Sequence, residues 1–222
     1  MFHRNKNKGI HLKTKENHER QEQNDHFDTF FSEVTDRMPQ KSAQLLKNSF
    51  GTLKVQAEKQ LATIATQFDH SFDSFLENVD EKQRKKCHEV IHSATLMAAI
   101  VTLSPIPLTD SAMLVPIQVV MMGRLHKLFG ASWTEGMAWS IAKETFLLTF
   151  IREIPGNLMK FIPFFGTAAG SIANVTVSVL TTEALGWITV NMLNKGEDVL
   201  GNGKKVSAQV KTALSMIKLT KK

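Results

Sequence analysis

Hydrophobic residues along this chain follow a helical spacing and become nearly continuous in its second half. From Phe27 onward they recur every three or four residues, first as Phe27, Phe30, Phe31, Val34 and Met38, then as Leu61, Ile64, Phe68, Phe72, Phe75 and Val79. This spacing predicts two amphipathic helices, a short one that ends near Pro39 and a longer one that packs against a helix of this chain or of a second copy. No segment alternates as a strand does, so we expect an all-α fold, built as a helical bundle or as hairpins.

Two long runs without any charged residue, Val90–Thr109 and Phe161–Thr182, dominate the second half of the chain. Ten charged side chains fall between residues 90 and 193, compared with 29 in the first 89 residues. Each run has about 20 residues, the length that a helix needs to cross the hydrocarbon core of a bilayer. The slightly negative mean hydropathy of the chain argues against a transporter with many spanning helices. The runs are therefore either membrane-inserted helices or the core of a soluble bundle.

Prolines and a capping motif divide this apolar half into helices. A helix that starts near Val90 must end before Pro105 and Pro107, because proline has no amide hydrogen and disfavours helical backbone in the residue before it. The motif Ser132-x-x-Glu135 predicts a capping box that opens a third helix. The last apolar helix is expected from Thr167 to about Leu193.

The helix between these two is expected to start at Thr109 or Asp110, to pass through Met113 and to stop at Gly130. Either of the first two side chains can accept hydrogen bonds from first-turn amides, and glycine readily adopts the left-handed conformation that ends helices. A charge such as Asp110 within an apolar region needs a reason. We expect it to cap the helix, or else to contact Gln118 or a partner protein.

Two basic clusters flank the apolar region. The first precedes Val90, and the second lies in a C-terminal segment where Val206, Val210, Leu214 and Ile217 would line one side of a helix. Basic amphipathic helices and juxtamembrane basic clusters are typical of contact with anionic lipid on the cytoplasmic side, although solvated termini have the same composition. The residues expected at such a membrane surface are Lys82, Arg84, Lys85, Lys86, Lys204, Lys205, Lys211 and Lys218.

The sequence contains no pattern that indicates catalysis or a cofactor. Cys87, His88 and His92 are close together, but structural zinc needs four ligands and no second pair follows at a suitable spacing. Nucleic acid is not expected as a partner, because the basic excess lies in a tail without aromatic residues. We therefore predict a non-enzymatic protein without a metal or cofactor.

Two segments carry a resemblance to a known family. Ser93–Gly130 contains Pro105, Pro107, Asp110, Gln118 and Gly130, and Phe161–Leu193 contains Pro163, Gly166 and Gly186. Together they resemble the YcjF-like family of bacterial domains of unknown function, which are often fused to GTPases or encoded beside them. The resemblance implies a membrane-associated helical domain that works with a GTPase, and it implies no known catalysis.

Any such GTPase is expected in trans. The segment that ends at Gly203-Lys204 suggests a phosphate-binding loop, but Asp198 and Lys205 stand where that loop requires glycine and Ser or Thr. The pattern divides the chain into a disordered polar tail (1–26), an amphipathic helical region (27–85), an apolar YcjF-like domain (86–195) and a basic amphipathic tail (196–222).

Two functional hypotheses follow. The first is an adaptor or anchor on or in the bacterial inner membrane, with its basic ends in the cytoplasm, acting with a GTPase. The second is a soluble all-α protein-interaction domain whose apolar helices cover one another, favoured by the Ser, Thr and Gly residues within the runs.

Overall fold

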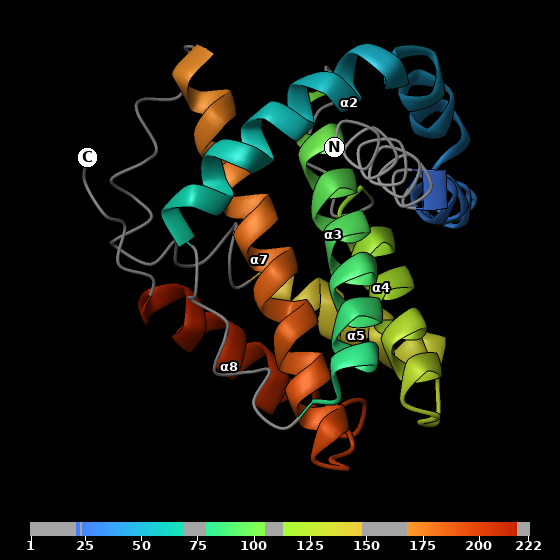
Figure 1. Ribbon diagram of the computed structural model, residues 1–222, viewed down its shortest axis with the longest axis vertical. Coiled ribbons are helices and arrows are strands. Elements are labelled where there is room, and N and C mark those ends of the chain that lie inside the picture. The colour runs from blue at the N-terminus through green and yellow to red at the C-terminus, as the bar shows by residue number, and fades with distance from the viewer. Residues whose placement is uncertain (1–20, 23, 69–78, 105–112, 148–167, 217–222) are drawn as a thin grey trace, which may run out of the picture.

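The computed structural model describes residues 21–22, 24–68, 79–104, 113–147 and 168–216, and all regular structure within these ranges is helical. The expectation of an all-α fold is therefore confirmed for this part of the chain. Figure 1 shows the arrangement of the helices, which are the helix at residues 24–35, α2 (Gln40–Phe68), α3 (Glu81–Leu103), α4 (Val115–Leu128), α5 (Glu135–Phe146), α7 (Ala168–Asn194) and α8 (Gly203–Met216).

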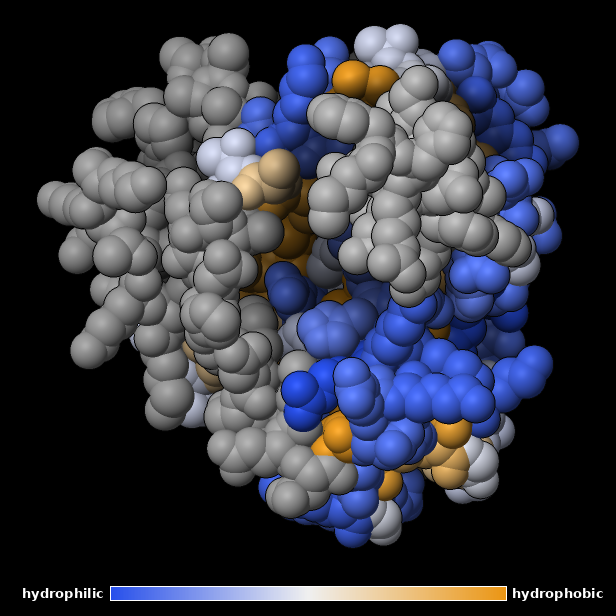
Figure 2. All heavy atoms as spheres, viewed as in Figure 1, coloured by the Kyte–Doolittle hydropathy of each residue, from blue (hydrophilic) through white to orange (hydrophobic). Residues whose placement is uncertain are grey.

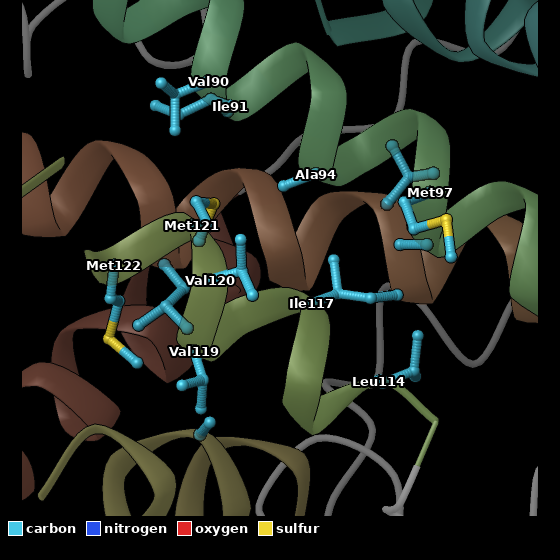
Figure 3. Packing of buried hydrophobic residues seen from close by; sticks show 14 of the residues in the cluster. Val90, Ile91, Ala94, Met97, Leu114, Ile117, Val119, Val120, Met121 and Met122 are labelled. Atoms are coloured by element: carbon cyan, nitrogen blue, oxygen red, sulfur yellow. The ribbon is translucent and has the colours of Figure 1, made fainter. Parts of the chain in front are cut away.

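Helices α3 and α7 lie side by side at the centre of the bundle and run antiparallel. The Thr102 hydroxyl donates a buried hydrogen bond to the Ser178 hydroxyl at 2.9 Å. Farther along, a β-carbon added to Gly186 would lie 2.8 Å from Ile91 Cγ1 and 3.1 Å from Met121 Sδ. The missing side chain therefore lets α3, α4 and α7 approach closely, and Figure 3 shows the labelled residues of α3 and α4 gathered where these helices pass α7.

The remaining helices cover this central pair. Helix α2 crosses the top of the view in Figure 1 and contacts α3 and α7. Helix α4 runs antiparallel to α3, since the Gln83 side-chain amide near the start of α3 donates to the Leu128 carbonyl at the end of α4 (3.4 Å). Helix α5 contacts α4 and α8, and α8 also packs against α7. The start of α3, the end of α4 and the end of α7 therefore lie at one end of the bundle.

Several predicted helix ends are confirmed. Helix α3 stops at Leu103, as the prolines beyond it require, although it starts at Glu81 and not near Val90. Gly130 follows α4 with a φ of 62°. A helix also ends before Pro39, although it begins by residue 24 and so includes the last residues of the tail predicted to be disordered. Helix α7 spans the predicted apolar helix. Pro105, Pro107 and Asp110 lie outside the described residues.

The helix after the prolines was predicted to include Met113, and this prediction is wrong. Helix α4 begins at Val115, and Met113 and Leu114 form a turn before it. Pro116 occupies the first turn of α4, where helix amides have no intrahelical acceptor and the fixed φ of proline is favourable. The local start signal is therefore this proline.

The predicted capping box is also wrong. Helix α5 begins at Glu135 itself, and Thr134 before it makes no capping hydrogen bond through its side chain. The carboxylate of Glu135 instead accepts hydrogen bonds from Arg37 Nε (3.1 Å) and from Trp139 Nε1 (3.4 Å). The Glu135 carboxylate, which a capping box would direct to the backbone at the helix start, is instead bound in a long-range ion pair with Arg37.

The predicted long N-terminal helix is placed differently. Helix α2 starts directly after Pro39 and ends at Phe68, while Val79 lies just before α3. Phe72 and Phe75 lie outside the described residues.

The apolar residues of the described helices are largely turned inward. Residues of the first uncharged run, including Ile91, Met97 and Ile100, are almost fully buried, as are Leu180, Leu185 and Ile188 of α7. Figure 2 shows a surface that is mostly hydrophilic over the coloured residues on this side of the molecule. Among the described helices, none is both long and apolar enough to cross a membrane.

Candidate functional site

A groove of about 1050 Å³ lies between the helix at residues 24–35, the start of α3 and the outer side of α4. One wall is formed by Asp25, Thr29 and Glu33 of the N-terminal helix. Their spacing of four residues places these side chains on one face of the helix. The loop after α4 closes the other side. The lining includes Asp25, Glu33 and Arg37 from the N-terminal segment, Lys86 and Val90 from α3, Val120, Gly123, Arg124, Lys127 and Leu128 from α4, and Ala131 and Trp133 from the loop.

Two ion pairs hold the N-terminal helix in place over the bundle. Arg124 donates two hydrogen bonds to the Glu33 carboxylate, at 2.9 Å from Nη2 and 3.3 Å from Nε, and its guanidinium lies 5.1 Å from the centre of the Phe30 ring. Arg37 donates to Glu135 at 3.1 Å and to the Glu33 carbonyl oxygen at 2.9 Å. These contacts join the N-terminal helix to α4 and α5 and so set the width of the groove.

Trp133 forms the far wall of the groove. Its indole packs on Gly123, where Cζ2 lies 3.1 Å from the position of an added β-carbon, and it contacts the His126 ring with 5.2 Å between centroids. The tryptophan is 37% exposed, whereas His126 is buried. An indole half open to solvent at the edge of a groove is a common feature of binding surfaces.

His126 is a neutral imidazole beneath this wall. Its Nδ1 lies 2.8 Å from the Met122 carbonyl oxygen, which can only accept, so Nδ1 carries the proton. Burial lowers the pKa of His126, while the Met122 carbonyl and the nearby Asp198 carboxylate oppose that shift. Within the described residues its Nε2 has no hydrogen-bond partner.

The charges of the groove are unequally neutralised. Arg124 and Arg37 are paired with carboxylates, whereas Lys86 and Lys127 are exposed and make no ion pair with any described residue. Asp25 is the remaining carboxylate on the lining. The groove therefore offers two ammonium groups that no carboxylate of the described ranges pairs with, beside a partly apolar wall.

A second, smaller cleft of about 470 Å³ lies on the other side of His26, between the N-terminal helix, α2 and α3. His26 Nε2, 4.0 Å from Glu89 Oε2, separates the two hollows. His88 and His92 line this cleft, but among the described residues no group of three or more potential ligands could hold a metal ion.

Six of the eight predicted membrane-surface residues lie at one end of the bundle, which we term the basic pole. The cluster before Val90 occupies the first turns of α3, and α7, antiparallel to α3, ends at the same place and leads through a short turn into α8. Figure 1 shows the start of α3 and the end of α7 together at the bottom of the view. The exposed members of the pole are Lys82, Arg84, Lys85, Lys86, Lys127, Lys195, Lys204 and Lys205.

Two other predicted surface residues lie elsewhere or cannot be placed. Lys211 is exposed farther along α8, and Lys218 lies outside the described residues. The apolar face predicted for this helix is buried in the bundle, since Val206, Val210 and Leu214 are each at most 1% exposed.

The residues predicted to be structural are only partly placed. Gly130 ends α4 and Gly186 lies at the contact of three helices, as described above. Gln118 is buried, and its side-chain oxygen has no partner among the described residues. Pro163 and Gly166, like Asp110, lie outside the described ranges.

Sequence reasoning missed the groove. Arg124 pairs with Glu33, 91 positions away, and nothing in the sequence around either residue indicates this contact. The available signal for Trp133 was a large aromatic residue in a short polar loop after Gly130.

Residues 66–154 match a family model described as a domain of unknown function (DUF697). The matched segment contains α3, α4 and α5, whereas the N-terminal helix, α7 and α8 lie outside it. The groove thus combines walls from inside and outside the matched segment. Comparison with curated proteins gave no match, and comparison with solved structures gave none either.

Proposed function

We propose that this chain is a non-enzymatic helical adaptor at the cytoplasmic face of a bacterial membrane. In this role it contacts anionic lipid through the basic pole and holds a partner protein, which the resemblance to YcjF-like domains suggests is a GTPase supplied in trans. The observation that carries the proposal is that basic clusters far apart in the sequence converge on one end of the bundle.

Surface contact explains this arrangement better than insertion of the described helices. Each lysine or arginine near an anionic leaflet contributes about 1 kcal/mol of attraction, so several on one pole are enough for reversible attachment. The apolar face of α8 is covered by protein, and Lys204 and Lys205 are exposed at its start, where Lys205 Nζ donates to the Glu197 carboxylate at 2.6 Å. The described parts of the two apolar runs are likewise buried in the bundle. The hypothesis of a soluble interaction domain requires this burial, and an adaptor attached only by charge is compatible with it.

An adaptor also suits the chemistry of the groove. Its closest oppositely charged groups, Glu33 and Arg124, satisfy each other in a two-bond ion pair that fixes two helices. Such a pair positions structure and leaves neither group ready to move a proton. We therefore assign the groove a binding role and no cofactor.

Vesicle flotation tests the membrane contact. The purified chain should float with vesicles that contain phosphatidylglycerol and not with phosphatidylcholine vesicles, and added salt should release it. Lys204→Glu combined with Lys205→Glu should weaken flotation, whereas the matched control Lys41→Glu with Lys47→Glu, two exposed residues of α2, should not. Equal flotation with neutral vesicles, or no effect of the α8 pair, would refute the lipid contact.

Photo-crosslinking in the native host tests the partner. A photoreactive residue at Leu128, partly exposed in the groove, should yield a discrete adduct that contains a GTPase. The same residue at Val55, exposed on α2, is the control and should not yield that adduct. A groove-specific adduct with no GTPase would disprove this part of the proposal.

A further inference from the structure

We infer that the groove receives an acidic amphipathic helix of the partner protein. This inference rests on the proposed adaptor function, to which it adds the docking site and the chemistry of the docked segment.

The shape of the groove suits a helix. Its two long walls are themselves helices, the one at residues 24–35 and α4, and an amphipathic helix docks in such grooves by inserting apolar residues from one face. The floor contains Val90 and Val120, which are buried in the core, so the floor is held in place by the packing of the bundle. Leu128, Ala131 and Trp133 are partly exposed along the edge and offer apolar contacts to an incoming side chain.

The charge of the groove selects an acidic segment. Lys86 lies near the start of α3 and Lys127 near the end of α4, and the hydrogen bond from Gln83 to the Leu128 carbonyl brings these two helix ends together. Both ammonium groups therefore lie toward one end of the groove, where the described residues supply neither with an ion-pair partner. Glutamate or aspartate side chains of a docked helix would neutralise them, whereas a basic segment would be repelled.

A lipid surface fits the groove less well. A bilayer presents a broad headgroup layer, which could reach Lys86 and Lys127 but would leave the hollow between the two helical walls unfilled. A volume of about 1050 Å³ is large even for a ligand site, so apolar side chains must enter it for the contact to exclude water. A helix with acidic and apolar faces meets both requirements at once.

Selection from a displayed library of random peptides against the whole chain tests this inference. The enriched peptides should combine acidic residues with apolar residues at helical spacing. Lys86→Glu combined with Lys127→Glu should weaken their binding by at least about tenfold. The matched control, Lys41→Glu with Lys47→Glu, should leave binding unchanged. A peptide whose acidic residues are replaced by lysine should bind the doubly substituted groove better than it binds the native one.

Other results would overturn the inference. Enrichment of basic peptides, no enrichment at all, or binding that ignores Lys86 and Lys127 would each do so. If the native chain selects no acidic peptide, while Lys86→Glu combined with Lys127→Glu still weakens flotation with anionic vesicles, these lysines serve only the lipid contact and the inference fails. Selection of acidic helices by a chain that does not bind anionic vesicles would support the inference while refuting the proposed membrane contact, so the two failures are distinguishable.

Discussion

Trp133 covers Gly123 so closely that its indole Cζ2 lies 3.1 Å from the point where a β-carbon at position 123 would be. The loop after α4 therefore lies directly on α4, and the wall of the groove depends on the absence of a side chain on the helix beneath it. Because Trp133 also contacts His126, the position of this one indole reports on the structure of the whole groove edge.

Gly123→Ala should move Trp133 without unfolding the protein. The added methyl group is too close to the indole, but Trp133 lies in an exposed loop and can yield, while alanine favours the helix by up to about 1 kcal/mol. In a background where Trp139 and Trp187 are phenylalanine, we expect altered Trp133 emission and easier quenching by acrylamide. Gly136→Ala, with no atom within 4 Å of its added carbon, is the control, and identical spectra for Gly123→Ala would contradict the packing.

Gly186→Ala should destabilise the bundle. Its β-carbon would lie 2.8 Å from Ile91 Cγ1, an atom close to the α3 backbone, so helices must separate or side chains must leave their preferred rotamers. Overpacking of this kind costs about 1–3 kcal/mol. Urea denaturation followed by circular dichroism measures the loss, and Gly136→Ala should not show it.

A second substitution makes this test specific to the contact. Ile91→Val removes a methyl group facing the glycine and should recover part of the stability lost in Gly186→Ala. Strictly additive effects would show that the two residues do not interact as described.

Gly130 and Gly186 illustrate what the sequence could and could not predict. Gly130 was recognised as a helix stop because that role depends only on its own backbone and the helix before it. Gly186 was noted only as part of a resemblance, since the reason for it is supplied by Ile91 and Met121 on two other helices. Local rules carry no information about such distant neighbours.

The candidate site likewise has features that the sequence indicates and features that only the packing of distant segments creates. The two basic clusters of the pole were identified from the sequence, whereas Lys127 and Lys195 were not, and the meeting of these residues depends on the antiparallel order of α3 and α7. The groove could not be predicted, because it exists only where the N-terminal helix packs on α4. Glu135 shows why: the local motif predicted a cap, and Arg37, 98 positions away, pairs with it instead.

Glu33→Gln should loosen the N-terminal helix. The substitution keeps the size of the side chain and removes its charge, so Arg124 loses a charge-assisted, two-bond partner. Because Glu33 is partly exposed, we expect the free energy of unfolding to fall by only about 1 kcal/mol. Arg124→Lys should have a similar effect, since lysine keeps the charge but cannot form the fork. In a double-mutant cycle by urea denaturation, additive losses would exclude the pair as a stabilising contact.

Cys87 should be unreactive in the folded protein and provides a check on folding for every variant above. It is the single cysteine of the chain, it is fully buried, and burial raises the pKa of its thiol to about 11. At pH 8 almost no thiolate is therefore present to react. We expect an aromatic disulfide reagent to leave the native chain unlabelled and to label one thiol per chain in denaturant. Rapid labelling without denaturant would place Cys87 at the surface.

The stability contributed by His126 should fall in mildly acidic solution. Burial lowers the pKa of the folded imidazole below its usual value of about 6.5, so the unfolded chain binds the proton more readily. The folded state therefore loses stability as the pH falls below about 6.5, and the loss levels off beneath the folded pKa. His126→Asn keeps an N–H group for the Met122 carbonyl and cannot titrate. The difference in unfolding free energy between the two proteins should be constant above about pH 7.5 and should shift in favour of His126→Asn at lower pH, because all other titratable groups are common to both. A difference that does not change with pH would show that His126 binds a proton equally well in both states.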